Sequence, residues 1–144
     1  MDIASLKQRL NSLDEDIKQL LKDTGYLREA DLFLDDYNKA DPEHSFILDE
    51  ARKVFSRLDD VHSALEYLNS PIEAQGVLTL KDNGRYAVGD KELSCGSALE
   101  VLVYDSWDEK EKWTYTTMEH NGDSYYLTGL RDTDPNGIQA RKRG

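Results

Sequence analysis

Apolar residues in the first seventy positions recur at alternating steps of three and four, a spacing that keeps one stripe of a helix out of water. The first series comprises Ile3, Leu6, Leu10, Leu13, Ile17 and Leu20. Leu27 and Leu34 continue this series beyond Gly25, a residue type that costs about 1 kcal/mol inside a helix. We therefore predict one long helix from about Asp2 to Asn38, with Gly25 as the site of any bend. The alternative is a break at Gly25 into two helices.

A second helix is predicted to begin at Asp41 and Pro42. The Asp41 carboxylate can cap its first turn, and Pro42 suits that turn because the N–H it lacks would be unpaired there. The helix should end near Asn69, before Pro71. Its apolar series is Ile47, Ala51, Val54, Leu58, Val61, Leu65 and Leu68. The two helices predict an antiparallel, coiled-coil-like helical hairpin over residues 1–70.

The predicted helices differ in length, at about 37 and about 27 residues, so part of the first apolar stripe would lack a partner within the hairpin. Two partners could cover this unpaired part of the apolar stripe. One is the second half of the chain, and the other is the first helix of a second protomer, which would make a homodimer.

From Gly76 onward the apolar period becomes two, which is typical of β-strands. The runs are GVLTL, RYAV, ALEVLVY, KWTYTTME, SYYLTGL and GIQAR. Turn-forming residues separate them: Asp82-Asn83-Gly84, Gly89-Asp90, Asn121-Gly122 and Asp134-Pro135-Asn136-Gly137. Asn-Gly between two alternating runs is the sharpest hairpin signal. We predict a meander of five or six strands that forms a small, partly open, SH3-like antiparallel β-barrel over residues 71–144. The fold class is α+β with two domains, 1–70 and 71–144.

The composition is strongly acidic, with 29 Asp and Glu against 18 Lys and Arg and a net charge of −11. This charge argues against a protein that coats nucleic acid or anionic membranes, because such proteins need a positive field. One cysteine excludes an intramolecular disulfide and a zinc site built from several cysteines. No apolar run is long enough to span a membrane, and the first residues do not resemble a signal peptide, so we expect a cytoplasmic protein with no membrane partner.

Acidic side chains recur on the predicted helices in pairs and one triplet, away from the apolar stripes. They are Asp14, Glu15, Asp16, Asp35, Asp36, Asp49, Glu50, Asp59 and Asp60. One interpretation is an ordinary solvated helix face, because such faces are normally charged. The other is a row of carboxylates that imitates a phosphate backbone and binds a protein with a basic surface. Interspersed bases weaken the second interpretation, since they can pair with neighbouring acids on the same helix. These bases are Lys18, Lys22, Arg52, Lys53 and Arg57.

No set of residues predicts catalysis. His44, His62 and His120 lack the spacing of metal ligands, and Cys95 has no histidine at a useful distance. The WDEKEKW segment is better explained as a polar hairpin loop than as a metal site. We therefore predict no enzyme, no metal and no cofactor. The basic residues at positions 141–143 are expected to be a frayed end, with a phosphate-binding tail as the alternative.

Aromatic residues crowd into the second half of the chain. Because neighbours on a strand point to opposite faces, Tyr125 and Tyr126 cannot both be core, whereas Trp113 and Tyr115 share a face. One set should fill the barrel. The other could form an aromatic binding platform or pack against the helices, and the candidates are Trp107, Trp113, Tyr115, Tyr125 and Tyr126.

Residues 76–143 carry a recognisable pattern, namely GRY, LSCGSALEVL, a tryptophan strand with T-x-M-E, YYLTGL and NGIQAR. The pattern resembles a small β domain of unknown function found in Firmicutes proteins of conjugative elements and phages. The resemblance covers about half the chain and excludes the predicted helices. It implies an accessory protein of a mobile element, and it assigns no catalytic residues.

Three hypotheses follow. The first is a non-enzymatic acidic protein-binding accessory factor whose partner has a basic surface. Its sharpest form is an anti-CRISPR-like inhibitor that occupies the nucleic-acid groove of a host defence nuclease. The second is a nucleic-acid-associated regulator that binds through the β-barrel, supported by the aromatic residues and by bases such as Lys81, Arg85 and Arg131. The third is an oligomeric scaffold.

Overall fold

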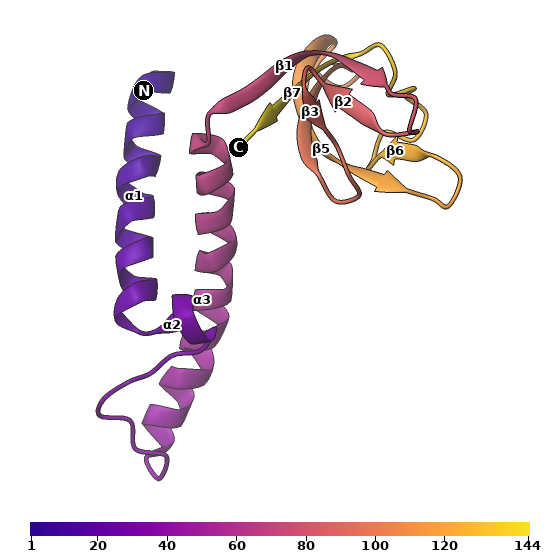
Figure 1. Cartoon of the computed structure of the whole chain (residues 1–144). Coiled ribbons are helices and arrows are strands. Elements are labelled where there is room, and N and C mark those ends of the chain that lie inside the picture. The colour runs from indigo at the N-terminus through magenta and orange to yellow at the C-terminus, as the bar shows by residue number, and fades with distance from the viewer. The chain divides into compact units, whose positions relative to one another are not determined.

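A computed structural model describes all 144 residues, and the chain divides into two compact units, Met1–Asn69 and Ser70–Gly144. The first unit is helical and the second is a sheet, so the α+β class is confirmed (Figure 1). The helices are α1 (Ile3–Asp23), α2 (Tyr26–Glu29) and α3 (Pro42–Asn69). No helix is both long enough and apolar enough to cross a bilayer.

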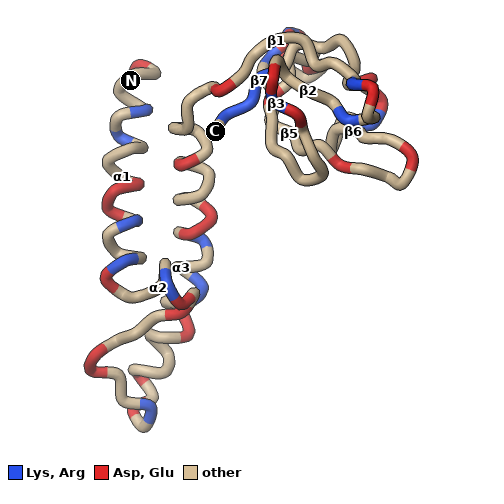
Figure 2. The backbone as a smooth tube through the Cα atoms, in the orientation of Figure 1, with Lys and Arg blue, Asp and Glu red and all other residues tan.

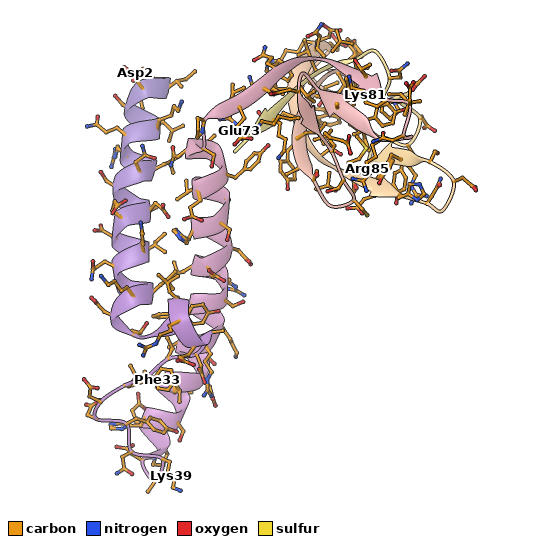
Figure 3. All side chains as sticks on the ribbon, in the orientation of Figure 1. Asp2, Phe33, Lys39, Glu73, Lys81 and Arg85 are labelled. Carbon is orange, nitrogen blue, oxygen red and sulfur yellow. The ribbon has the colours of Figure 1, made fainter.

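Helix α1 ends at Asp23, so the prediction of one helix to Asn38 is wrong and the alternative break at Gly25 is correct. Gly25 adopts a left-handed conformation with φ +79°, which favours glycine and interrupts the helix. The chain then folds back, and the Phe33 N–H donates to the Thr24 carbonyl at 2.9 Å. A Cβ at Gly25 would lie 2.9 Å from the Phe33 ring, which Figure 3 labels.

Helix α3 begins and ends where its sequence predicts. The Glu43 N–H donates to the Asp41 carboxylate at 2.9 Å, so Asp41 caps the helix and Pro42 occupies its first position. The α3 helix has 28 residues and α1 has 21, which reverses the predicted order of lengths. The first helix is therefore not the longer one, and the unpaired end predicted for it is absent.

Helices α1 and α3 run in opposite directions and share an apolar core (Figure 1). Its buried members are Ile17, Leu21, Leu32, Leu48 and Phe55. The segment between α2 and α3 is fastened to α3 by Asp31, whose two carboxylate oxygens accept from Arg52 at 3.0 and 3.2 Å. The Arg52 guanidinium, and then the Leu32 N–H, hold the pKa of Asp31 below its usual value.

The second unit is one antiparallel sheet of seven strands in the order β3-β2-β1-β7-β4-β5-β6, curled into a half-barrel. The strands are β1 (Ile72–Leu80), β2 (Tyr86–Val88), β3 (Lys91–Glu92), β4 (Ala98–Asp105), β5 (Lys110–His120), β6 (Tyr125–Leu127) and β7 (Gln139–Arg143). All six predicted runs contain a strand, and β3 is an additional short one. Leu78, Val88, Leu99, Val101, Met118 and Leu127 belong to the fully buried core on the inner face.

The sheet is not the predicted meander, because β7 lies between β1 and β4. Gln75 pairs with Arg141, and Arg141 pairs with Glu100 on the other side. The basic residues at positions 141–143 are therefore part of a strand with neighbours on both sides, and the prediction of a frayed end is wrong.

Candidate functional site

The acidic residues predicted to bind a partner lie mainly on the surface of the helical unit. Glu15, Asp16, Asp35, Asp36, Asp49, Glu50 and Asp60 are exposed, and Asp59 is half-buried. Figure 2 shows acidic positions along both long helices and on the segment that joins them. The unit carries 16 acidic and 9 basic residues, a net charge of −7.

Asp14 does not belong to this surface. It is 8% exposed and lies between α1 and α3, where its carboxylate is 2.8 Å from Nδ1 of the buried His62. The expectation that Asp14 sits away from the apolar stripe is therefore wrong. The pair satisfies two polar side chains that would otherwise be costly to bury.

Helical spacing spreads the acidic residues around the helices. Successive positions differ by about 100° around a helix, so Asp49 and Asp59 of α3 lie about 80° apart. Asp49 also contacts Arg52 at 3.6 Å, and Glu50 contacts Lys53 at 2.9 Å. The acidic surface is thus broad and partly neutralised. It does not form the single row of carboxylates that would imitate a phosphate backbone.

A second surface of the helical unit is apolar and exposed. Two sets of side chains, each repeating every seven residues, keep between 41% and 51% of their area accessible. We call them the exposed apolar face: Leu6, Leu13 and Leu20 of α1, with Ile47, Val54, Val61 and Leu68 of α3. A seven-residue repeat is the pattern by which one helix packs along another.

Both sets lie on the same side of the helix pair. On α1, the exposed Leu13 immediately precedes the buried Asp14, and on α3 the exposed Val54 immediately precedes the buried Phe55. On both helices, therefore, the exposed stripe is reached from the buried stripe by the same rotation about the helix axis, that of one residue towards the N-terminus. Because α1 and α3 run in opposite directions, this rotation brings the two stripes to one common side.

The outer face of the sheet carries part of the predicted aromatic platform. Trp113 and Tyr115 share the outer face of β5, as predicted, opposite Leu102 and Glu100 of β4. Tyr115 is 58% exposed, and the Arg141 guanidinium lies 4.2 Å from the centre of the Trp113 ring. This cation–π contact keeps one side of the tryptophan covered.

The other platform candidates do not join this surface as one group. Trp107 is 92% exposed, in the turn between β4 and β5. Tyr125 packs against the core and against His120, with ring centres 4.6 Å apart. Tyr126 lies on the outer face, on the same side of the sheet as Trp113 and Tyr115, with the Arg131 guanidinium 4.8 Å from its ring centre. Tyr125 and Tyr126 thus point to opposite faces, as predicted.

Glu100 organises a buried charge cluster on the outer face. Its side chain is 8% exposed and accepts from Arg141 at 2.7 Å and from Arg143 at 2.7 Å. Arg143 also donates to the Ser70 carbonyl at 3.0 Å. Both arginines are therefore bound within the sheet. A phosphate-binding tail, the alternative prediction, would need them to contact phosphate instead.

The WDEKEKW segment is only partly a hairpin loop, because residues 107–109 lie in the turn between β4 and β5 whereas residues 110–113 begin β5. Lys112 contacts Asp105 at 2.7 Å and Asp108 at 2.8 Å, and both hydrogen bonds raise the pKa of its ammonium group. Lys112 in turn lowers the pKa of Asp105, with help from backbone N–H groups of Asp108 and Trp107. No group of three His, Cys, Asp or Glu side chains is placed to hold a metal ion.

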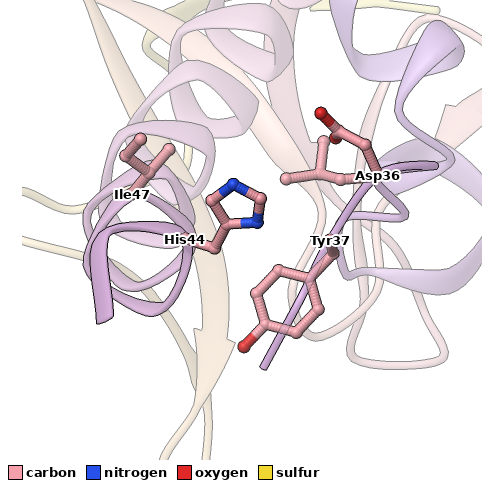
Figure 4. Close-up of a pocket in the computed structure, with 5 residues that line it drawn as sticks. Asp36, Tyr37, His44 and Ile47 are labelled. Atoms are coloured by element: carbon pink, nitrogen blue, oxygen red, sulfur yellow. The ribbon is translucent and has the colours of Figure 1, made fainter. Parts of the chain in front are cut away.

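A shallow pocket of about 140 Å³ lies where the segment before α3 meets that helix (Figure 4). Its labelled lining residues are Asp36, Tyr37, His44 and Ile47, and Leu34 completes it. His44 Nδ1 accepts from the Asn38 N–H at 3.0 Å, so the imidazole holds the backbone turn. The pocket is smaller than the roughly 300 Å³ at which ligand sites begin.

Comparison with known proteins identifies part of the second unit. Residues 76–142 match the family model of a domain of unknown function (DUF5348). No curated protein and no solved structure matches the chain. The match confirms a domain of unknown function over the sheet, whereas its origin in mobile elements of Firmicutes and its SH3-like character stay predictions.

Proposed function

We propose that this protein is a non-enzymatic, cytoplasmic accessory factor that binds another protein through the acidic surface of its helical unit. The observation that carries the proposal is the exposure of seven of the nine predicted acidic residues on a unit of net charge −7. A field of this sign attracts a basic protein surface and accelerates its association. The resemblance of the second unit supports a role in a mobile element or phage.

The narrower form of the proposal is inhibition of a host defence nuclease whose nucleic-acid groove would accept the acidic helices. The spread of the carboxylates around α1 and α3 favours contact with a broad basic surface over imitation of one nucleic-acid strand. A second candidate, nucleic-acid binding by the sheet, has the exposed Tyr115 in its favour. Against it, Arg141 and Arg143 are bound by Glu100.

Affinity capture from a Gram-positive lysate tests the proposal. The variant replaces Glu15, Asp49, Asp59 and Asp60 by their amides, which removes charge and preserves side-chain size. We expect the wild-type chain to retain basic proteins at low salt and to lose them at high salt, since exposed charges are screened. The variant should retain fewer of them at either salt concentration.

A control variant with the same charge change in the second unit replaces Glu109, Glu111, Asp123 and Asp132 by their amides. It should capture the same proteins as the wild type. Equal capture by the helical variant, or capture that high salt does not reduce, would refute contact through the acidic surface. A panel of purified nucleases, assayed for binding and for cleavage, then tests the narrower form.

A further inference from the structure

We propose that the exposed apolar face binds a second copy of this chain, so that α1 and α3 of two protomers form a four-helix bundle. This inference does not rest on the proposed function, because it is argued from the apolar side chains of the helical unit. Asp16 is the one residue that belongs to the acidic surface and also takes part in the arrangement described below. The face is defined by Leu6, Leu13, Leu20, Ile47, Val54, Val61 and Leu68.

The spacing of the face indicates that a helical surface covers it. Each stripe repeats every seven residues over three or four positions, and an ordinary α-helix drifts by about 20° per heptad from such a repeat. A strict seven-residue repeat therefore suits a neighbour around which the helices coil, with side chains packed as knobs into holes. Two stripes side by side present a surface as wide as a pair of helices.

The composition of the face makes it self-complementary. The α1 stripe consists of leucine, and the α3 stripe is mostly β-branched. A twofold axis parallel to the helices places α1 of one copy against α3 of its partner. The leucines then meet Val54, Val61 and Leu68 of the partner's α3, and leucine against β-branched side chains fills a core with interlocking shapes. Ile47 precedes His62 by fifteen residues, so it lies beyond the end of α1 and outside this contact.

The size of the face is of the order that a dimer needs. The six side chains that meet across the dimer, at about half exposure, leave roughly 250 Å² of apolar surface on each copy. A standard interface has about 450 Å² of apolar area on each partner. The stems of long polar side chains beside the stripes can supply part of the difference.

Charges at the border of the face are also complementary in this arrangement. The bond between Asp14 and His62 sets which residues of α1 and α3 lie at the same height. Rotation about an axis parallel to the helices leaves these heights unchanged. Arg57 precedes His62 by five residues, so in the partner it lies between the heights of Asp16 and Asp23.

Arg57 and Asp16 both border the face. Arg57 follows Val54 by three residues and precedes Val61 by four, and Asp16 has the same relation to Leu13 and Leu20. The dimer therefore places a guanidinium near two carboxylates on each edge. The pairs fix the register and offset part of the repulsion between two chains of charge −11.

Sedimentation velocity of the full chain tests the inference. We expect a species of twice the 16.5 kDa chain mass that persists at high salt, because burial of apolar surface is not screened. Val54→Glu should give a monomer with an unchanged helical circular dichroism spectrum, since Val54 is half exposed in one copy. A wild-type chain that is monomeric at all concentrations overturns the proposal and leaves the face to a different kind of protein.

Charge reversal tests the register separately. Arg57→Glu should weaken the dimer by about tenfold, and the combination of Arg57→Glu with Asp16→Lys and Asp23→Lys should restore it. Lys18→Glu changes the net charge equally on an exposed position of α1 away from the border, so it should leave the dimer unchanged. Equal effects of Arg57→Glu and Lys18→Glu would overturn the proposed arrangement.

Discussion

Replacing Glu100 by alanine should destabilise the second unit more than any surface substitution. The carboxylate is bound by Arg141 and Arg143, whose side chains are only 19% and 16% exposed. The substitution would leave two guanidinium groups next to each other in the centre of the sheet. Like charges would then repel in a position where little water can hydrate them.

The magnitude follows from the burial of the cluster. Removing one partner of a buried ion pair costs about 3–5 kcal/mol. Because both arginine side chains keep part of their surface in water, we expect about 3 kcal/mol. A unit of this size has roughly 4–11 kcal/mol of stability, so Glu100→Ala should remove a large part of the free energy of unfolding.

Urea unfolding followed by tryptophan fluorescence measures this loss. Trp113 lies under Arg141 and should report on the cluster, and Trp107→Phe removes the exposed second tryptophan from the signal. The control is Glu92→Ala, which removes an exposed bond to Arg85 of 3.2 Å and should cost less than about 1 kcal/mol. A loss for Glu100→Ala as small as that of the control would refute the reasoning.

Three further predictions concern the helical unit. Asp14→Leu combined with His62→Leu should be tolerated, whereas Asp14→Leu alone should cost about 1–3 kcal/mol, measured by chemical unfolding. The single substitution leaves the buried Nδ1 of His62 without its partner and only the 3.4 Å contact of Nε2 with Glu66 in place. Gly25→Ala should lower stability by at least about 1 kcal/mol by the same measurement, since φ is +79° and the new Cβ has no room; an unchanged midpoint would contradict the strain. Because the pKa of the Asp31 carboxyl is lowered in the folded state, its bond to Arg52 stabilises the unit above the ordinary pKa of an aspartate, and this contribution is lost as the pH falls through the lowered pKa. The free energy of unfolding should therefore depend less on pH on the acid side in Asp31→Asn than in the wild type. Identical curves for the two proteins would exclude the effect.

Local chemistry predicted the boundaries that depend on neighbouring residues. Asp41 and Pro42 specify the start of α3 within their own turn, and Asn121-Gly122 specifies the connection from β5 to β6. Gly25 was ambiguous because an apolar series continued beyond it. The contact of the returning chain with α1, through Phe33, decides the break, and no short-range pattern contains that contact.

The candidate surfaces show the same limit. The apolar series of α1 has two sides, and a single antiparallel helix can bury only one of them. The side with Ile17 faces α3 together with Asp14, and the side with Leu13 remains exposed. The sequence identified the apolar stripe of α1, but it did not show which side of the stripe α3 buries and which side stays exposed. Glu100 was missed because its partners on β7 are some forty residues away.

The position of β7 has a consequence for the order of events during synthesis. Strands β1–β3 and β4–β6 are made first, and the strand that joins these two three-stranded groups is made last. While residues 139–143 are still inside the ribosome, the growing chain holds two separate groups with open edges and an unneutralised Glu100. The sheet should therefore form after translation of this segment, and a stop codon just before Gln139 should yield an unfolded product that proteases remove.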